Sequence, residues 1–447
     1  MATGNRTQMD GKHGKYMVVL YTKPADCGGN CLYCIKSNGV TRSTIPNEDT
    51  LLAYDTQWSS AQQLINRCRD AGVKMHTGNK FELRIKGNSF TNYPFAYLEN
   101  FIKEVYDLLN RKPSKTFQEA FEAQLHAKDK VVQIVVETRP DQITHEWCQQ
   151  MLKWGVRTVE IGVQSLNESV LLANTRGHDV QCVRDASHLI RKYGFELGFQ
   201  VMLGLYQSNQ KLDAQMLTND LWQECFYPDS LKVYPCLLLP DRQAQIPLYS
   251  LYDKKQWKPI EQRQYDEFLK SVLPFIPKDV HVNRWQRIFR EDEVAYGPKR
   301  IINRRVEHKG LSQCMWQRSV QNSLIPHDNV DECQITTYRH GNEVCVQAVD
   351  SNDIIFGYAR LRLDGQSAYI RDLRVLGNPL SVGQRPTAQQ LDIQHQGVGK
   401  KMVKSMEQYA KQNGALNIVV NSSAGCVGYF RKLGYTNTTY YQLKKEL

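Results

Sequence analysis

Three closely spaced cysteines near the start of the chain constrain its fold and chemistry more than any other feature. Cys27, Cys31 and Cys34 have the spacing C-x3-C-x2-C and follow the apolar run of residues 16–21, which predicts a buried strand. A proline and two glycines next to the cysteines predict a loop. We therefore expect the three thiols on one loop at the carboxyl end of a strand, where their thiolates can converge on one site.

The number and spacing of these thiols favour an iron–sulfur cluster over zinc. A structural zinc site normally has four protein ligands, and no nearby Cys or His completes the set before Cys68. A [4Fe–4S] cluster held by three cysteines keeps one iron free for a substrate or cofactor. With Tyr33 just before the last cysteine, the motif resembles the signature of the radical S-adenosylmethionine (SAM) enzymes. A zinc loop, or cysteines without a shared role, is the alternative.

Composition and charge place the chain among globular proteins with a polyanionic partner. The 447 residues suffice for two or three domains, and the nine other cysteines are scattered, as in a reducing compartment. The 57 Lys and Arg against 46 Asp and Glu give a net charge of +11, which favours nucleic acid as the partner, although such charge also serves solubility alone. No apolar run reaches the roughly 18 residues of a membrane span. The N-terminus has no signal-like apolar segment, so we expect a cytoplasmic protein without a membrane partner.

The first two thirds of the chain alternate strand-like and helix-like segments, which predicts a parallel sheet closed or partly closed into a barrel. The strand-like runs cover residues 81–87, 131–138, 158–165, 196–204, 230–239 and 280–285. Polar residues follow several of these runs, at the end of a barrel that carries its active site. They are Asn88, Ser89, Thr138, Arg139, Gln164 and Ser165, and each could also be a cap or a surface residue.

A basic stretch lies between the two parts of the chain. Residues 284–318 contain nine Lys or Arg against four acidic residues. Because the whole chain is basic, we expect this stretch to contact nucleic-acid phosphates. A solvated connector is the alternative.

From about residue 333 the pattern changes to four antiparallel strand-like runs, followed by a glycine turn and an amphipathic helix. The turn reads Gln394-x-x-Gly397-x-Gly399, and a strand (NIVVN) and the segment GYFRKLGY follow the helix. Backbone N–H groups at a helix N-terminus bind phosphates. This order resembles the acyl-CoA-binding fold of the GNAT N-acetyltransferases, in which the pyrophosphate lies on the glycine turn. A strand–turn–helix without a ligand is the alternative.

The two halves together resemble the catalytic subunit of Elongator and its single-subunit relatives, the tRNA uridine(34) acetyltransferases. Matching segments include YTKPADCGGNCLYC, ETRPD, EIGVQSL, NTRGH, IRDLRVLG, IQHQGVG and YFRKLGY. The resemblance implies an α/β fold in which a radical SAM, partial TIM-type barrel precedes an α+β GNAT domain. The expected boundaries are a basic tail at 1–16, the barrel at 17–290, a basic linker at 291–332 and the GNAT domain at 333–447.

The resemblance also implies an activity, the formation of 5-carboxymethyluridine at the wobble position of tRNA. A 5′-deoxyadenosyl radical would take hydrogen from the acetyl group of acetyl-CoA, the carbon radical would add to C5 of uridine, and the thioester would be hydrolysed. The implied cofactors are a [4Fe–4S] cluster and SAM, with acetyl-CoA as co-substrate and the tRNA anticodon stem-loop as partner. Accessory or Elongator-like subunits are left open. The alternatives are a protein lysine acetyltransferase and a tRNA-binding scaffold with impaired chemistry.

Site residues follow from the resemblance, position by position. Cys27, Cys31 and Cys34 correspond to the cluster ligands, and Tyr429 and Lys232 to catalytic positions, although Lys232 could equally form an internal ion pair. The expected acetyl-CoA contacts are Lys80, Asp372, Leu373, Arg374, Val375, Val398, Gly399, Lys400 and Phe430. For Lys80 the alternative is a solvated side chain before a strand.

Two positions depart from the family pattern. Asn88 follows Gly87 where many relatives have a second glycine that helps to hold the methionine part of SAM; Asn tolerates positive φ better than most residues. Phe430 replaces a tyrosine, which leaves Tyr429 as the hydroxyl of that pair. The isolated Cys314 does not predict a structural zinc.

Overall fold

The computed structural model describes residues 9–12, 14–37, 40–42, 53–285, 293–299, 311–323, 326–387 and 391–447. These residues form an eight-stranded sheet, a seven-stranded sheet and a short two-stranded ribbon. The ribbon consists of β3 (Ile35–Ser37) and β4 (Val40–Arg42) and directly follows the cysteines. In the part of the chain that is described, no helix is long and apolar enough to cross a membrane.

The first sheet is built of strands in chain order, as the alternating pattern predicts. Its strands are β1 (Met9–Lys12), β2 (Lys15–Tyr21), β5 (Lys80–Lys86), β6 (Lys130–Thr138), β7 (Thr158–Gln164), β8 (Glu196–Leu203), β9 (Ser230–Pro235) and β10 (His281–Arg284). From β2 to β10 every neighbouring pair is parallel, whereas β1 is antiparallel to β2. The expected partial barrel is confirmed. Residues 9–12, placed in the tail by the sequence, form β1, because backbone pairing with β2 needs no apolar pattern.

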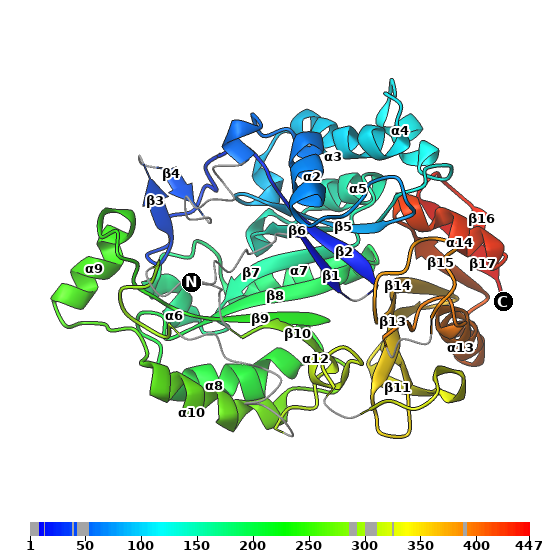
Figure 1. Cartoon of the computed structure of the whole chain (residues 1–447). Coiled ribbons are helices and arrows are strands. Elements are labelled where there is room, and N and C mark those ends of the chain that lie inside the picture. Colours follow the sequence, from blue (N-terminus) through cyan, green and yellow to red (C-terminus); the bar gives the residue numbers. More distant parts are fainter. Residues whose placement is uncertain are drawn as a thin grey trace.

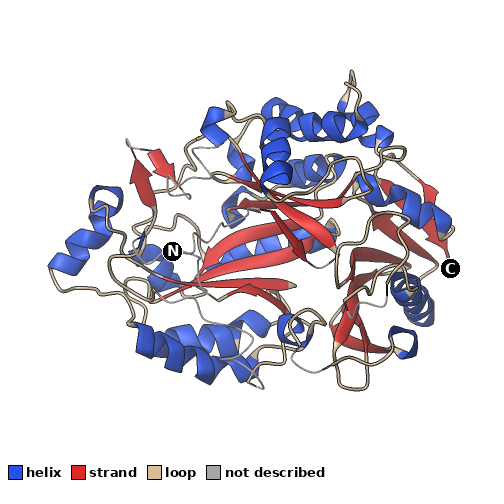
Figure 2. Cartoon of the chain, in the orientation of Figure 1, coloured by secondary structure: helices blue, strands red, loops and turns tan. Residues whose placement is uncertain are grey.

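Helices connect the parallel strands and lie around the outside of this sheet (Figures 1 and 2). They are α2 (Ser60–Asp70), α3 (Phe95–Asn110), α4 (Phe117–Ala123), α5 (His145–Lys153), α6 (Glu168–Ala173), α7 (Val180–Lys192), α8 (Gln210–Thr218), α9 (Ile246–Asp253) and α10 (Gln262–Val272). In α3 the buried residues Leu98, Phe101, Ile102 and Val105 recur at helical spacing, so one face packs onto the sheet. These crossovers direct every carboxyl end of the parallel strands to the same edge of the sheet.

The second sheet has the order β11-β12-β13-β14-β15-β17-β16. Its strands are β11 (Gln334–His340), β12 (Glu343–Val349), β13 (Ile355–Asp364), β14 (Ser367–Val375), β15 (Asn417–Asn421), β16 (Thr436–Asn437) and β17 (Gln442–Glu446). Four antiparallel strands lead to α13 (Val398–Gln412), which returns the chain to β15, parallel to β14; the short α14 (Val427–Lys432) follows. The predicted strand–turn–helix–strand order is confirmed, and α13 lies on the side away from the barrel (Figure 1).

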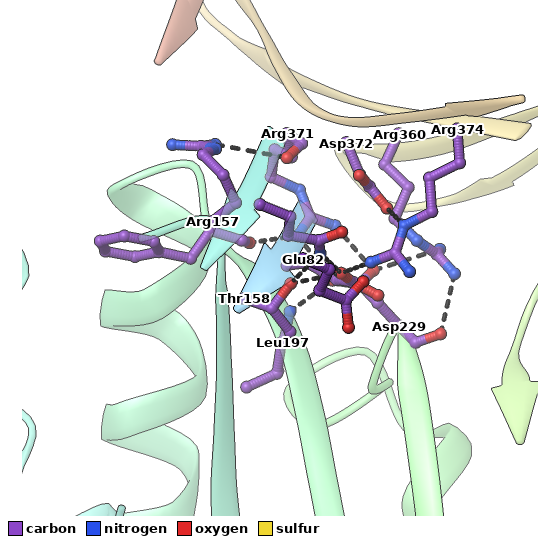
Figure 3. Close-up of polar contacts among 12 residues, drawn as sticks. Glu82, Arg157, Thr158, Leu197, Asp229, Arg360, Arg371, Asp372 and Arg374 are labelled. Atoms are coloured by element: carbon purple, nitrogen blue, oxygen red, sulfur yellow. Dashed lines mark hydrogen bonds and ion pairs between the residues drawn. The ribbon is translucent and has the colours of Figure 1, made fainter. Parts of the chain in front are cut away.

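Buried arginines of the second sheet contact the amino ends of the barrel strands (Figure 3). Arg371 of β14 donates to the carbonyl of Phe195, just before β8, and Arg360 of β13 donates to the carbonyl of Asp229, just before β9, at 2.7 and 2.8 Å. In return, Arg157, just before β7, donates to the carbonyl of Arg371 at 3.3 Å. The second sheet therefore covers the end of the barrel opposite to the cysteine loop.

Candidate active site

The three cysteines lie on the loop between β2 and β3, at the carboxyl end of the parallel strands. Cys31 is buried, and Cys27 and Cys34 are partly exposed. A hydrogen bond between the Cys31 and Cys34 thiols lowers the pKa of Cys31 and raises the pKa of Cys34. At Cys31, burial opposes this effect and the positive charge of Arg176 adds to it, so the pKa of Cys31 is lowered overall. Cys27 instead accepts a hydrogen bond from the Gly29 amide at 3.4 Å. Among the described residues no three Cys, His, Asp or Glu side chains converge closely enough to hold a metal, so Cys27 must turn toward the other two to share one.

Two buried arginines from neighbouring loops face this cysteine loop. Arg176 donates through Nη1 to the sulfur of Cys31 at 3.5 Å and through Nη2 to the carbonyl of Gly162 at 2.6 Å. Arg139 is held by Asp141, at 3.0 Å from Nε to Oδ1 and from Nη2 to Oδ2. A Cβ on Gly29 would collide with its Nη1. The site is therefore rich in positive charge.

Asn88 lies at the same end of the barrel, after β5. It is buried, its amide donates to the Tyr93 hydroxyl at 3.4 Å, and its φ is not positive. The tolerance of Asn for positive φ is therefore not used. At Gly87 a side chain is excluded, because a Cβ there would collide with the Thr22 hydroxyl.

The inner face of the barrel carries a chain of ion pairs that runs from the amino to the carboxyl ends of the strands. Arg84 bonds Glu82 at 2.6 Å and Glu160 at 3.1 Å. Lys232 contacts both Glu160 and Glu137, the latter at 2.9 Å. Burial lowers the pKa of Lys232, but the two carboxylates outweigh it and raise the pKa above its usual value. Lys232 thus forms the internal ion pair that the sequence left open.

The chain of ion pairs ends at the carboxyl mouth of the barrel with Lys86 and Glu137. Lys86 Nζ lies 3.7 Å from Glu137 Oε1, and both side chains are partly exposed, unlike Lys232. Although Glu137 raises the pKa of Lys86, burial and the charges of Lys232 and Arg284 lower it to about 7. Lys86 can therefore exchange a proton near neutral pH at the mouth that carries the cysteine loop. Burial raises the pKa of Glu137, but the charges of Lys232 and Lys86 outweigh it and hold the pKa well below its usual range, so Glu137 stays ionised.

The glycine turn opens α13 in the second sheet. Gly397 has φ +84 and precedes the helix, with no side-chain cap and with open space where a Cβ would be. A Cβ on Gly399 would lie 2.8 Å from the Tyr429 hydroxyl, so Tyr429 faces this turn. Val398 is buried, and Lys400 is exposed. The first amides of α13 are therefore accessible, with Tyr429 beside them.

Tyr429 and Phe430 differ in their surroundings. Tyr429 is 38% exposed, and burial of its hydroxyl raises its pKa to about 12. Phe430 is buried, with ring centroids 5.4 Å from Tyr429 and 5.5 Å from Tyr435. The phenylalanine therefore packs in the core of the second sheet, and the hydroxyl at this position comes from Tyr429.

Residues 372–375 form the end of β14 that extends beyond its pairing with β15. β14 pairs with β15 only as far as Ile370, and an extra residue, Arg371, bulges from its ladder with β13. In the strand, Asp372 bonds Arg374 at 2.7 Å, and Arg374 reaches Glu196 in the barrel. Leu373 and Val375 are partly buried. One backbone edge of residues 372–375 therefore faces no strand in the described ladder.

Lys80 connects the barrel to the glycine turn. It begins β5 and donates to the side chain of Gln394, three residues before Gly397. Gln394 also donates to the carbonyls of Gly14 and Val375, at 2.8 and 3.1 Å. Burial lowers the pKa of Lys80 to about 8. The structure thus brings Lys80 to the turn, while the cysteine loop lies at the other end of the barrel.

Most of the basic stretch 284–318 lies outside the described residues. This applies to Arg287, Arg290, Arg300, Arg304, Arg305 and Lys309. Of the rest, Lys299 is exposed, whereas the Arg318 side chain is nearly buried and bonds Asp353 and Gln347. Arg318 is therefore an internal contact and not a phosphate ligand.

Comparisons with known proteins match both halves of the chain. Residues 23–214 match the radical SAM superfamily, and residues 389–446 match the acetyltransferase (GNAT) domain. The chain is 28% identical to the tRNA uridine(34) acetyltransferase of Methanocaldococcus infernus, over 97% of this chain and 86% of the relative. It is 27% identical to human Elongator complex protein 3, over 96% of this chain and 84% of the relative. The solved structure of the archaeal Methanocaldococcus infernus Elp3 with an N-terminal deletion (1–46) superimposes with a TM-score of 0.79 at 26% identity, covering 97% and 99% of the two chains. The chain is thus a homologue, over almost its whole length, of Elongator complex protein 3 and of the tRNA uridine(34) acetyltransferases.

The residues of this chain fit the cofactors that its two matched domains imply, namely an iron–sulfur cluster, SAM and acetyl-CoA. Three thiols with the sulfur chemistry that iron–sulfur clusters require lie on one loop. Beside them, Arg139 Nη1 is buried without a hydrogen-bond partner in the described part of the chain, as expected where an anionic group binds. At the other site, open amides at the start of α13 suit a phosphate.

The sequence did not predict several residues of the cysteine loop, of the glycine turn and of the contact between the two sheets. No role was predicted for Arg176, Gln394 or Asp229, nor for the charged inner face of the barrel. A signal for that face was present in β5, where Lys80, Glu82, Arg84 and Lys86 alternate with apolar residues. Such alternation indicates one polar face, which here lines the barrel.

Proposed function

We propose that this protein modifies the wobble uridine of tRNA, forming 5-carboxymethyluridine from acetyl-CoA by SAM radical chemistry. One observation carries the proposal: a single chain joins a three-thiol loop, at the carboxyl ends of a parallel barrel, to an open glycine turn of the acetyltransferase type. Relatives named tRNA uridine(34) acetyltransferase, aligned over 96–97% of the chain, support tRNA as the substrate.

Cys27, Cys31 and Cys34 would hold the iron–sulfur cluster. When bound, the cluster and SAM supply radical chemistry able to remove a hydrogen atom from the acetyl methyl group. Arg139 and Arg176 contribute positive charge beside the thiolates. The buried thiol of Cys31 is shielded from water in this loop, which suits a reactive centre.

Acetyl-CoA would bind along the second sheet. The amides of Val398, Gly399 and Lys400 would hold its pyrophosphate, and the backbone edge of residues 372–375, which no described strand covers, would lie along the pantetheine. The Lys80 ammonium adds charge close to the turn. Tyr429 offers the hydroxyl beside Gly399.

The barrel interior would orient the reacting groups. Lys232 is enclosed between two carboxylates and has no access to a substrate, so we assign it a positioning role for Glu137 and Glu160. Glu137 and Lys86 reach the mouth, where Lys86 can accept or donate a proton and the ionised Glu137 would hold it in place.

The tRNA anticodon stem-loop is the proposed polyanion for a chain of charge +11. The cytoplasm is the proposed compartment. Accessory or Elongator-like subunits are further partners in this proposal.

The test is an anaerobic assay of the iron-loaded protein with tRNA, SAM, a reductant and acetyl-CoA labelled with carbon-13 in both acetyl carbons. We expect labelled 5-carboxymethyluridine in digested tRNA, and none when SAM is omitted. Unlabelled tRNA together with SAM-independent acetylation of protein lysines would contradict the proposal and favour the lysine acetyltransferase.

A further inference from the structure

Arg176 is a buried cation with no carboxylate partner. It is 6% exposed, and among the described residues no Asp or Glu lies within ion-pair distance of its guanidinium. Its bonded partners are the Gly162 carbonyl and the Cys31 sulfur. Burying a guanidinium without a compensating negative charge is costly. The negative charge that would balance Arg176 must therefore come from the cysteine loop or from what it binds.

Arg139, unlike Arg176, has a carboxylate partner, but it also lies against the cysteine loop. Asp141 and the carbonyl of Arg176 hold its Nε and Nη2, so the guanidinium is fixed. Its Nη1 is buried and has no hydrogen-bond partner among the residues that the structure describes. That nitrogen lies above Gly29, whose amide contacts the Cys27 sulfur. Each arginine is thus fixed by protein groups. Arg176 directs its Nη1 to Cys31, and Arg139 directs its Nη1 to Gly29, next to Cys27.

We propose that Arg176 and Arg139 set the reduction potential of the iron–sulfur cluster held by this loop. Reduction adds an electron to the cluster, and N–H···S hydrogen bonds and nearby positive charge stabilise the more negative form. Both arginines therefore raise the potential and make reduction easier. Arg176 has the larger effect, because its N–H already reaches a ligand sulfur at 3.5 Å. The inference rests on the proposed iron–sulfur site but not on the proposed tRNA substrate.

The test measures the cluster and not the tRNA reaction. Full-length protein is reconstituted anaerobically with iron and sulfide, its iron content is determined, and its midpoint potential is measured by an EPR-monitored titration without SAM. The variants are Arg176→Met, Arg176→Lys and Arg139→Met. Arg191→Met is the control, because Arg191 is also 6% exposed but bonds the carbonyls of Glu224 and Cys225, away from the cysteine loop.

We expect Arg176→Met to bind as much iron as the wild type and to have a more negative midpoint potential. Arg176→Lys keeps the charge and should lie in between, Arg139→Met should shift less in the same direction, and Arg191→Met should not shift. An unchanged potential in both methionine variants of the loop arginines would overturn the inference. Loss of iron in these two variants alone would also overturn the inference, because the two arginines would then serve to anchor the loop. A wild-type protein that binds no iron would instead refute the iron–sulfur site of the proposed function, and the inference with it.

Discussion

The guanidinium of Arg371 in β14 forms two parallel hydrogen bonds with the carboxylate of Asp229 in the barrel, 2.7 and 2.8 Å long (Figure 3). A second cation, Arg360, lies 3.1 Å from the same carboxylate. Burial raises the pKa of Asp229, but the two arginines outweigh it and hold the pKa well below its usual range. One carboxylate thus joins the acetyltransferase sheet to the barrel.

Replacing Asp229 should therefore destabilise the whole protein. Asp229→Ala removes the carboxylate partner of Arg360 and leaves Arg371 with Glu343 alone. Removing one partner of a buried ion pair typically costs about 3–5 kcal/mol. Urea denaturation should show this loss of unfolding free energy, whereas Asp364→Ala, at an exposed position, should have little effect. Equal stability of the two variants would contradict the assigned role of Asp229.

Acetyl-CoA binding should depend on the charge of Lys80. Because its pKa is lowered to about 8, Lys80 is charged below that pH and neutral above it. If its ammonium helps to hold a polyphosphate, affinity falls as the pH rises through about 8. Calorimetry between pH 7 and 9.5 should show this fall in the wild type and a flatter profile in Lys80→Met. Parallel profiles would remove Lys80 from the binding site.

A side chain at Gly399 should obstruct the pyrophosphate turn. The new Cβ of Gly399→Ala would meet the Tyr429 hydroxyl at 2.8 Å, so either the turn or Tyr429 must move. We expect acetyl-CoA affinity to fall by about tenfold, equivalent to about 1.4 kcal/mol. Gly428→Ala is the matched control, because the nearest atom to its Cβ would be 3.9 Å away. Unchanged affinity in Gly399→Ala would place the pyrophosphate elsewhere.

The basic stretch should contribute to tRNA binding by releasing counterions. Arg300, Arg304 and Arg305 lie outside the described residues, so this prediction rests on charge. Neutralising all three should lower the slope of log affinity against log salt by roughly 2 units on single-stranded or 3 on duplex RNA. Arg242→Gln, an exposed arginine already paired with Asp253, is a control for total charge. A slope unchanged in the triple variant would identify the stretch as a connector.

Features encoded over short segments could be predicted from the sequence. The cysteine loop follows its strand because an apolar run ends in glycine and proline, and the turn at Gly397 needs the positive φ that glycine adopts readily. Both depend on neighbours within a few residues. The alternation of strands and helices likewise predicted the parallel sheet.

Contacts between distant segments could not be predicted. Arg371 and Asp229 are 142 positions apart, and Lys80 and Gln394 are 314 apart. No local pattern specifies such pairs, because they depend on how the two sheets dock. For the same reason the sequence could not decide between a substrate contact and an ion pair for Lys232.

The most direct test of the central claim compares Cys31→Ser with Cys182→Ser, which alters a partly exposed cysteine on α7. Serine is a poorer ligand for iron than cysteine. Both anaerobically prepared variants are assayed for 5′-deoxyadenosine and for 5-carboxymethyluridine in tRNA, with tRNA and acetyl-CoA affinities measured in parallel. We predict that Cys31→Ser loses both products while keeping both affinities, and that Cys182→Ser retains all four. Formation of the modified uridine by Cys31→Ser would contradict the radical mechanism.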